Sequence, residues 1–222
     1  MGRIDELSRT ENPVSKYIGW KSNDKKFGSY NKISKKTELI DLPVSFIYVT
    51  STVSIKGWSE ANSCGIWSNQ VTNTSNEILV VKADKKIIAS GLYKDIKDKV
   101  KAEGGRFIQN VFCTIDGEPC VIEIKGASLM AWSNFFKAAQ QKLKYNLCKV
   151  DGFVDGKKGA VKYTVPKFEV GEKISTIALE ESDIMYESVK SYLKQYKLSE
   201  DTKEEQLNDV EADTDQDEDL PF

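Results

Sequence analysis

The chain of 222 residues contains no histidine, which removes the commonest general base and the commonest zinc ligand. Its four cysteines, Cys64, Cys113, Cys120 and Cys148, include no Cys-x-x-Cys pair, a spacing that argues against structural zinc. Cys113 and Cys120 lie in apolar, strand-like runs, where we expect small core residues. We therefore expect neither a metal site nor a cofactor.

The sequence also lacks the signatures of a membrane protein and of a nucleotide-hydrolysing enzyme. No apolar run approaches the roughly 18 residues that a membrane span needs, and no signal peptide precedes the expected fold, so we expect a cytoplasmic protein with reduced thiols. No Gly-x-x-x-x-Gly-Lys-Ser/Thr phosphate loop is present. Only Asp116, Glu118 and Glu123 are acids at expected strand ends, a weak set for a nuclease. We expect a binding protein and no enzyme.

Charge is distributed very unevenly along the chain. Residues 200–222 hold 11 acids and one lysine, a net charge of −10, whereas residues 1–199 hold 31 basic and 23 acidic residues, a net charge of +8. A basic body joined to an acidic segment is typical of a polyanion binder that carries its own anionic competitor. An ordinary lysine-rich surface would also give a net charge of this size.

The acidic segment ends in Asp217-Glu218-Asp219-Leu220-Pro221-Phe222. This end resembles the tip of bacterial single-stranded DNA-binding protein (SSB), in which several acids precede Ile-Pro-Phe, with Leu220 in the usual place of Ile. It also resembles the acidic, Phe-ended tails of phage replication ssDNA-binding proteins. The resemblance implies that residues 217–222 recruit a replication protein (polymerase, helicase or primase), that the tail competes with DNA for the groove, and that a phage-encoded chain works in the host cytoplasm.

The body departs from SSB in having a larger domain and a short, charged linker, so the resemblance leaves open whether the protein forms a homo-oligomer.

Residues 13–36 interleave aromatic rings with lysines, a composition that suits bases and phosphates, although an N-terminal hairpin could instead pack the rings on the domain. The ssDNA-binding residues expected in this segment are Trp20, Lys21, Lys25, Lys26, Phe27, Tyr30 and Lys32.

Residues 44–58 alternate like a long strand, with core residues on one face. The opposite face carries Phe46, Tyr48, Lys56 and Trp58, which are either exposed for stacking or covered by a second layer. From this strand and the chain that follows it we expect further ssDNA contacts at Tyr48, Lys56, Trp58, Trp67 and Arg106.

The remaining pattern predicts a mostly β protein with added helices. Strands at 44–58, 77–82, 85–90, 106–115 and 118–125, with a helix between the third and fourth, match the order of an OB-fold, a five-stranded barrel that binds oligonucleotides. A helix over 127–146, a hairpin over 147–170 and a last helix over 182–197 follow. We expect a domain over residues 1–199 and a disordered acidic tail over 200–222.

Together these features predict a protein that binds single-stranded DNA with little sequence preference in replication, recombination or repair. Three alternatives stay open: a recombination strand-annealing protein, an RNA-binding OB module, and an adaptor without nucleic-acid binding.

A tail that competes with DNA should weaken DNA binding. We expect residues 1–199 to bind ssDNA more tightly than residues 1–222, because a coil of 23 residues reaches roughly 25–30 Å and could lie over a basic groove. Fluorescence titration with oligo-dT at matched salt measures the difference, and equal affinities would contradict competition by the tail.

Overall fold

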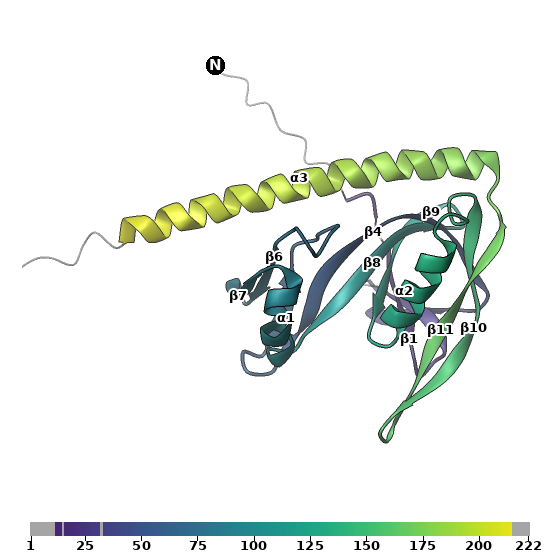
Figure 1. Ribbon diagram of the computed structural model, residues 1–222, viewed down its shortest axis with the longest axis horizontal. Helices are drawn as coiled ribbons and strands as arrows, with labels where there is room; N and C mark the ends of the chain where they lie inside the picture. The colour runs from purple at the N-terminus through teal and green to yellow at the C-terminus, as the bar shows by residue number, and fades with distance from the viewer. Residues whose placement is uncertain (1–11, 15, 32, 215–222) are drawn as a thin grey trace, which may run out of the picture.

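The computed structural model describes residues 12–14, 16–31 and 33–214, with side chains through residue 195 (Figure 1). These residues form eleven strands and three helices in the following order: β1 (Lys16–Lys21), β2 (Lys26–Asn31), β3 (Lys36–Ile40), β4 (Val44–Ser59), β5 (Cys64–Ser68), β6 (Leu79–Ala83), β7 (Lys86–Gly91), α1 (Tyr93–Ala102), β8 (Gly105–Ile115), β9 (Glu118–Lys125), α2 (Ser128–Ala139), β10 (Asn146–Lys158), β11 (Val161–Lys173) and α3 (Thr176–Thr214).

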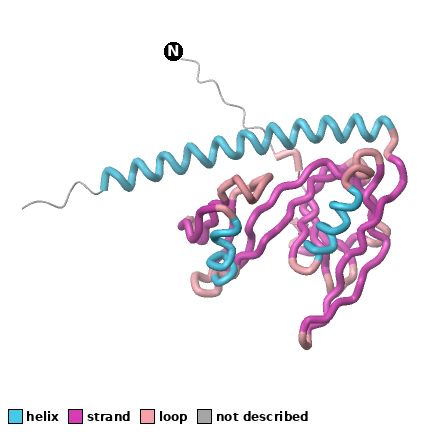
Figure 2. The backbone as a smooth tube through the Cα atoms, viewed as in Figure 1, coloured by secondary structure: helices cyan, strands magenta, loops and turns pink. Residues whose placement is uncertain are grey.

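The strands join in one sheet with the order β3-β2-β1-β9-β8-β4-β5-β6-β7. The pairing of β1 with β9 is parallel, and the other pairings are antiparallel. Strand β10 leaves this path by pairing with the first residues of β4, and β11 pairs with β10 to form a long hairpin (Figure 2). This hairpin, here called the arm, extends away from the sheet.

The prediction of a mostly β protein with added helices is confirmed, but a closed OB barrel is not. Strands β3 and β7 lie at opposite ends of the strand order and do not pair with each other, so the sheet is open over the described residues. The physical reason lies in residues 16–40, which include most of the segment 13–36 that the sequence predicted to be a nucleic-acid surface or an N-terminal hairpin. They form three strands, and β1 takes the edge of β9 where a barrel would close.

The two faces of the sheet are covered by different helices. On β8, Val111 and Cys113 point into a core with Trp132 of α2, while Phe112 between them packs with Met185 and Val189 of α3. This alternation follows from the two-residue period of a strand. Burial of Trp132, the largest fully buried side chain, contributes about 3–5 kcal/mol by comparison with core truncations elsewhere.

A third core lies under α1 at the other end of the sheet. Ile96 and Val100, four residues apart, place one face of α1 on Ile55, Leu79 and Val81. The helix stops at Gly104, which has a φ of +93°. Neither a Cβ at Gly57 nor one at Gly104 fits here, since each would overlap a backbone carbonyl oxygen of the facing segment. Glycine is therefore required where β4 and the start of β8 approach each other.

Helix α3 is longer than the sequence predicted. It begins at Thr176 instead of residue 182 and continues to Thr214, past residue 197 and through the first 15 residues expected to be a disordered tail. The extension has a physical basis, because Glu, Lys, Gln and Leu are strong helix formers and recur in residues 200–211. Figure 1 shows its C-terminal end beyond β6 and β7. Residues 215–222, with the Leu-Pro-Phe tip, lie outside the described residues.

The close approach at Gly57 generates a stability prediction. Gly57→Ala should lower the free energy of unfolding by about 1–3 kcal/mol, because the new methyl group would meet the carbonyl oxygen of Gly104 and force the backbone apart. Urea denaturation followed by circular dichroism measures the change. Gly19→Ala is the matched control, since nothing lies within 4 Å of a Cβ there. Equal midpoints for the two variants would contradict the steric argument.

Candidate functional site

A row of side chains crosses five strands on the face of the sheet that also carries α3. Arg106 of β8 opposes Lys56 of β4, and Lys56 opposes Trp67 of β5. Trp67 opposes Lys82 of β6, which in turn opposes Ile87 of β7. Directly opposed residues have Cβ atoms about 4.5–5.5 Å apart on the same face of a sheet. Register thus places cations on both sides of the Trp67 indole.

A second exposed indole lies next to this row. Trp58 follows Lys56 by two residues and shares its face, and it opposes Gly65, where nothing lies within 4 Å of a Cβ position. The side chains of Trp58 and Trp67 are 54% and 40% exposed. The Nζ of Lys82 lies 5.4 Å from the centre of the Trp67 ring. The missing side chain at Gly65 leaves open space beside the Trp58 indole.

A hollow of about 700 Å³ lies at the end of the row where β4, β8 and β9 meet. The glycines Gly57, Gly104 and Gly105 line it together with Trp58. Its charged lining residues are four cations and two carboxylates: Lys56, Lys101, Arg106, Lys125, Glu60 and Glu123. Lys56 is paired with Glu123, and its Nζ also lies 5.3 Å from the centre of the Tyr17 ring. Glu123 therefore orients the central lysine toward the hollow.

A second hollow, of about 870 Å³, lies between the end of β9, the start of α2 and the arm. Arg106, Glu123 and Lys125 line both hollows, so the two adjoin. The arm contributes Lys158 and Tyr163 to the second hollow. The second hollow lies on the α2 side of the sheet, because its lining includes Phe27 and Ile122 of the core below α2. It meets the first hollow at the end of β9, and the two hollows and the row form a candidate site, here called the basic groove, with six cations and two carboxylates.

Hydrogen bonds hold the arm in place against the N-terminal strands. The N–H of Thr164 donates to Oγ of Ser22 at 2.6 Å, and its hydroxyl donates to the Ser22 carbonyl oxygen at 2.8 Å. The indole N–H of Trp20 donates to the Thr164 carbonyl oxygen at 3.0 Å. Lys25 adds a contact, with its Nζ 4.7 Å from the centre of the Phe153 ring. The wall of the second hollow is thus fixed before any ligand arrives.

The end of the arm concentrates positive charge. Lys157 and Lys162 directly oppose each other in the register of β10 and β11, and Lys158 is the last residue of β10 before the turn. Like charges in direct opposition destabilise a hairpin. An anion bound there would relieve this repulsion, which gives the arm an electrostatic reason to contact a polyanion.

Two of the predicted stacking residues are buried. Phe27 is 1% exposed in the core below α2, because residues 26–31 form a central strand of the N-terminal hairpin. Tyr48 packs on Trp132 and Phe136, and burial raises its pKa above the ordinary value. A bulge between Tyr48 and Thr50 places Tyr48 on the face opposite Lys56. Phe27 is therefore packed on the domain by the N-terminal hairpin, and Tyr48 and Phe46 are covered by a second layer, which were the alternatives to exposure for stacking.

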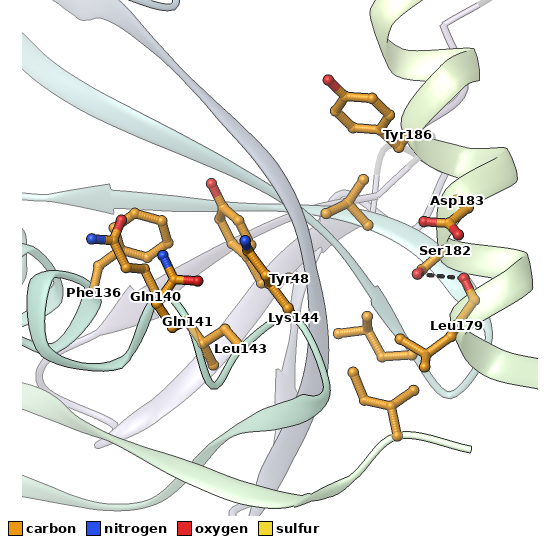
Figure 3. A pocket seen from close by; sticks show the side chains of 13 residues that line it. Tyr48, Phe136, Gln140, Gln141, Leu143, Lys144, Leu179, Ser182, Asp183 and Tyr186 are labelled. Atoms are coloured by element: carbon orange, nitrogen blue, oxygen red, sulfur yellow. Dashed lines mark hydrogen bonds between the residues drawn. The ribbon is translucent and has the colours of Figure 1, made fainter. Parts of the chain in front are cut away.

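Tyr48 lines a separate hollow of about 420 Å³ between the end of α2 and the first turns of α3 (Figure 3). Phe136 and Leu143 lie on one side and Tyr186 on the other, with the Ser182 hydroxyl donating to the Leu179 carbonyl oxygen at 2.7 Å. None of the residues that line this hollow lines the basic groove, so Tyr48 is not brought together with Trp58 and Trp67.

The remaining predicted residues divide between the groove and other places. Lys56, Trp58, Trp67 and Arg106 come together as described, and the half-buried Trp20 lines the second hollow. Four others are outside the groove lining: Lys21 lies against Gly28, Lys25 against Phe153, Lys26 pairs with Asp41 at 2.6 Å, and Tyr30 is exposed on β2. Lys32 and the tip residues 217–222 lie outside the described residues.

Several groove residues were missed by sequence reasoning. Lys82, Lys101, Lys125 and Tyr163 come from four different elements and carry no local motif. Only the strand register brings Lys82 to Trp67, and only the arm's position brings Tyr163 near Lys125. Lys158 had a signal, because the Gly-Lys-Lys turn of the hairpin is visible in the sequence.

The cysteines lie outside the groove lining. Cys113 opposes Cys120 across β8 and β9, and burial raises the pKa of the Cys113 thiol well above its ordinary value. Burial also raises the pKa of Cys148. Among the described residues there is no group of three or more His, Cys, Asp or Glu side chains placed to hold a metal ion.

Comparison with protein-family models, with curated proteins and with solved structures gave no match. The likeness of the acidic end to SSB is therefore a feature of six residues only. In the part of the chain that the structure describes, no helix combines the length and apolar character needed to cross a membrane.

The exposure of the two groove indoles can be tested without a ligand. We expect acrylamide to quench a substantial part of the tryptophan emission, because Trp58 and Trp67 are open to solvent while Trp132 is buried. The double variant Trp58→Phe/Trp67→Phe should lose most of the quenchable emission and shift the remainder to shorter wavelength. A Trp20→Phe variant is the control, since this ring is half buried. Unchanged quenching in the double variant would contradict the exposed row.

Proposed function

We propose that the protein binds single-stranded DNA in the basic groove, with little sequence preference, in a replication or recombination system. The observation that carries this proposal is the cross-strand row, which places the exposed Trp67 between Lys56 and Lys82, with Trp58 beside it. Exposed indoles gain energy when a partner covers them, and the flat face of a base is one such partner. Lys56, whose side chain is 44% exposed, supplies charge for a phosphate beside the indoles, whereas Lys82 is 7% exposed and lies against the Trp67 ring.

Single strands fit this arrangement better than duplexes. A base can stack on an indole only when its face is free, and bases inside a duplex already stack on each other. Stacking on an aromatic side chain contributes about 1–3 kcal/mol per base and tolerates any sequence, because every base has a π-face.

The acidic C-terminal segment would act on the same groove and on partners. Residues 200–214 extend α3 as a helix of net charge −6, which repels DNA phosphates through its field instead of lying in the groove as a coil. The tip, Asp217 to Phe222, would recruit a replication protein, since an apolar end preceded by acids suits a hydrophobic pocket on a partner that is surrounded by basic residues.

Titration with oligo-dT tests the proposed DNA binding. Trp58→Ala and Trp67→Ala should each weaken binding about 5- to 150-fold, which corresponds to the loss of one stacked base. Fluorescence anisotropy of a labelled oligonucleotide measures this without depending on tryptophan emission. Tyr145→Ala, which removes an exposed ring outside the groove lining, is the matched control and should bind as the parent protein does.

Salt dependence in the same assay tests the phosphate contacts. Arg106→Gln should reduce the slope of log affinity against log salt by about one, because one phosphate contact is lost.

Other ligands in the same assay distinguish the other functions. Equal affinity for oligo-U would favour an RNA-binding module, and rapid pairing of complementary strands would favour an annealing protein. No binding to any single strand at low salt would overturn the proposal and leave an adaptor.

A further inference from the structure

The end of the arm is a narrow, exposed β-ribbon. Residues 157–162 are all exposed, and the arm extends away from the sheet (Figure 2). The turn between its two strands consists of Gly159 and Ala160, so no large side chain widens the tip. Paired strands lie about 4.8 Å apart. A projecting ribbon of this shape is suited to enter a groove in a partner.

The lysines at this end lie on both faces of the ribbon. Lys157 and Lys162 oppose each other and share one face. Lys158 opposes Val161, and this pair lies on the other face because the side chains of a strand alternate. Asp155 is the carboxylate in this part of the ribbon, and residues 155–162, with three lysines and one acid, have a net charge of +2.

Lysines nearer the base of the arm are neutralised by neighbours, whereas those at its end are not. Lys149 pairs with Asp151, and Lys167 pairs with Glu169. Among the described side chains, none forms an ion pair with the three lysines at the end of the arm. The arm therefore places uncompensated positive charge at the point that a ligand reaches first.

This combination of shape and charge fits the groove of a DNA duplex. The major groove of B-DNA is about 12 Å wide and admits a two-stranded β-ribbon. Phosphate backbones form both walls of this groove, so lysines on both faces of the ribbon would meet both walls. Val161, which is 66% exposed, suits contact with the methyl groups of thymines there. A second copy fits less well, because two paired arms would bring six lysines together.

The arm is held beside the groove that we propose for the single strand. Lys158, Val161 and Tyr163 line the second hollow, so a strand in that hollow would leave it along the arm. The two hydrogen bonds between Thr164 and Ser22 fix the direction of the arm. A ribbon that is already ordered loses little conformational freedom when it binds.

We propose that the end of the arm enters the major groove of a duplex that continues from the bound single strand, so that the protein binds junctions between single-stranded and duplex DNA. The inference deepens the proposed function and rests on it, because the single strand in the basic groove places the duplex beside the arm. The exposed indoles would hold the single strand, while the lysines at the end of the arm hold the duplex.

Anisotropy titrations with three labelled ligands test the proposal: an oligo-dT, a blunt hairpin duplex, and the same duplex with the oligo-dT as a tail. The parent protein should bind the tailed duplex about tenfold more tightly than oligo-dT at low salt. Lys157→Gln/Lys162→Gln should remove this gain and reduce the salt slope for the tailed duplex by about two, one for each phosphate contact. Its oligo-dT affinity should stay unchanged, because neither lysine lines the groove.

The matched control is Lys94→Gln/Lys97→Gln. It removes the same charge from exposed positions of α1 outside the lining of both hollows, and it should keep the gain from the duplex. Misfolding is checked by thermal denaturation. The arm variant should melt at the same temperature as the parent protein or higher, because it removes two like charges in direct opposition.

Three results would overturn the role of the arm. The first is equal affinity of the arm variant and the parent protein for the tailed duplex. The second is an equal loss of affinity for oligo-dT and for the tailed duplex, which would assign the arm to the single strand. The third is a dimer that dissociates in Val161→Ser, which would assign the arm to a second copy. A protein that binds the blunt duplex through the two lysines but binds no oligo-dT would retain the arm as a duplex contact and refute the proposed groove, so the two proposals fail separately.

Discussion

The hydrogen bonding of strand β4 is the constraint on which the rest of the molecule depends. Its 16 residues pair with β8 along most of their length, with β10 at the start and with β5 at the end. One strand therefore fixes the arm, the central sheet and the β5–β7 meander relative to each other. A slip of one residue in this pairing would turn Lys56 and Trp58 to the opposite face and Ile55 out of its core. The apolar cores under α1 and α2 thus determine where the charged row lies.

The division of the two faces explains how a small protein can expose two indoles without losing its core. Helices α1 and α2 pack on one face, and the described side chains of α3 pack on the other against Phe112, Val121 and Val49. The bulge in β4 is needed for this arrangement, because it sends Tyr48 to the α2 side while Lys56 stays on the α3 side. On this second face the exposed indoles Trp58 and Trp67 lie beside buried residues such as Ile108 and Val80, so the row is supported from below without drawing on the cores under α1 and α2.

Local patterns predicted most elements, whereas long-range pairing was beyond them. Asp116-Gly117 marks the β8–β9 turn, and both residues have the positive φ that a tight hairpin demands. The Gly104-Gly105 stop after α1 and the stripe of α2 are equally local. In contrast, the parallel pairing of β1 with β9 joins residues about a hundred positions apart, and no sequence pattern specifies it. That single pairing separates an open sheet from a closed barrel.

The candidate site shows the same limit. Trp58 was found because it lies beside Gly57 at a strand end, and Trp67 because it lies in a stretch rich in Ser, Asn and Gly. Phe27 has a similar local sequence and is buried, since its strand lies between β1 and β3. The difference depends on which strand is central, a property of the assembled sheet. Composition could therefore suggest a surface for stacking and charge, but only strand register and the hydrogen bonds of Thr164 decide which rings face the groove. Because the site depends on strand pairing in this way, it should be lost during unfolding at the same point as the sheet and not earlier.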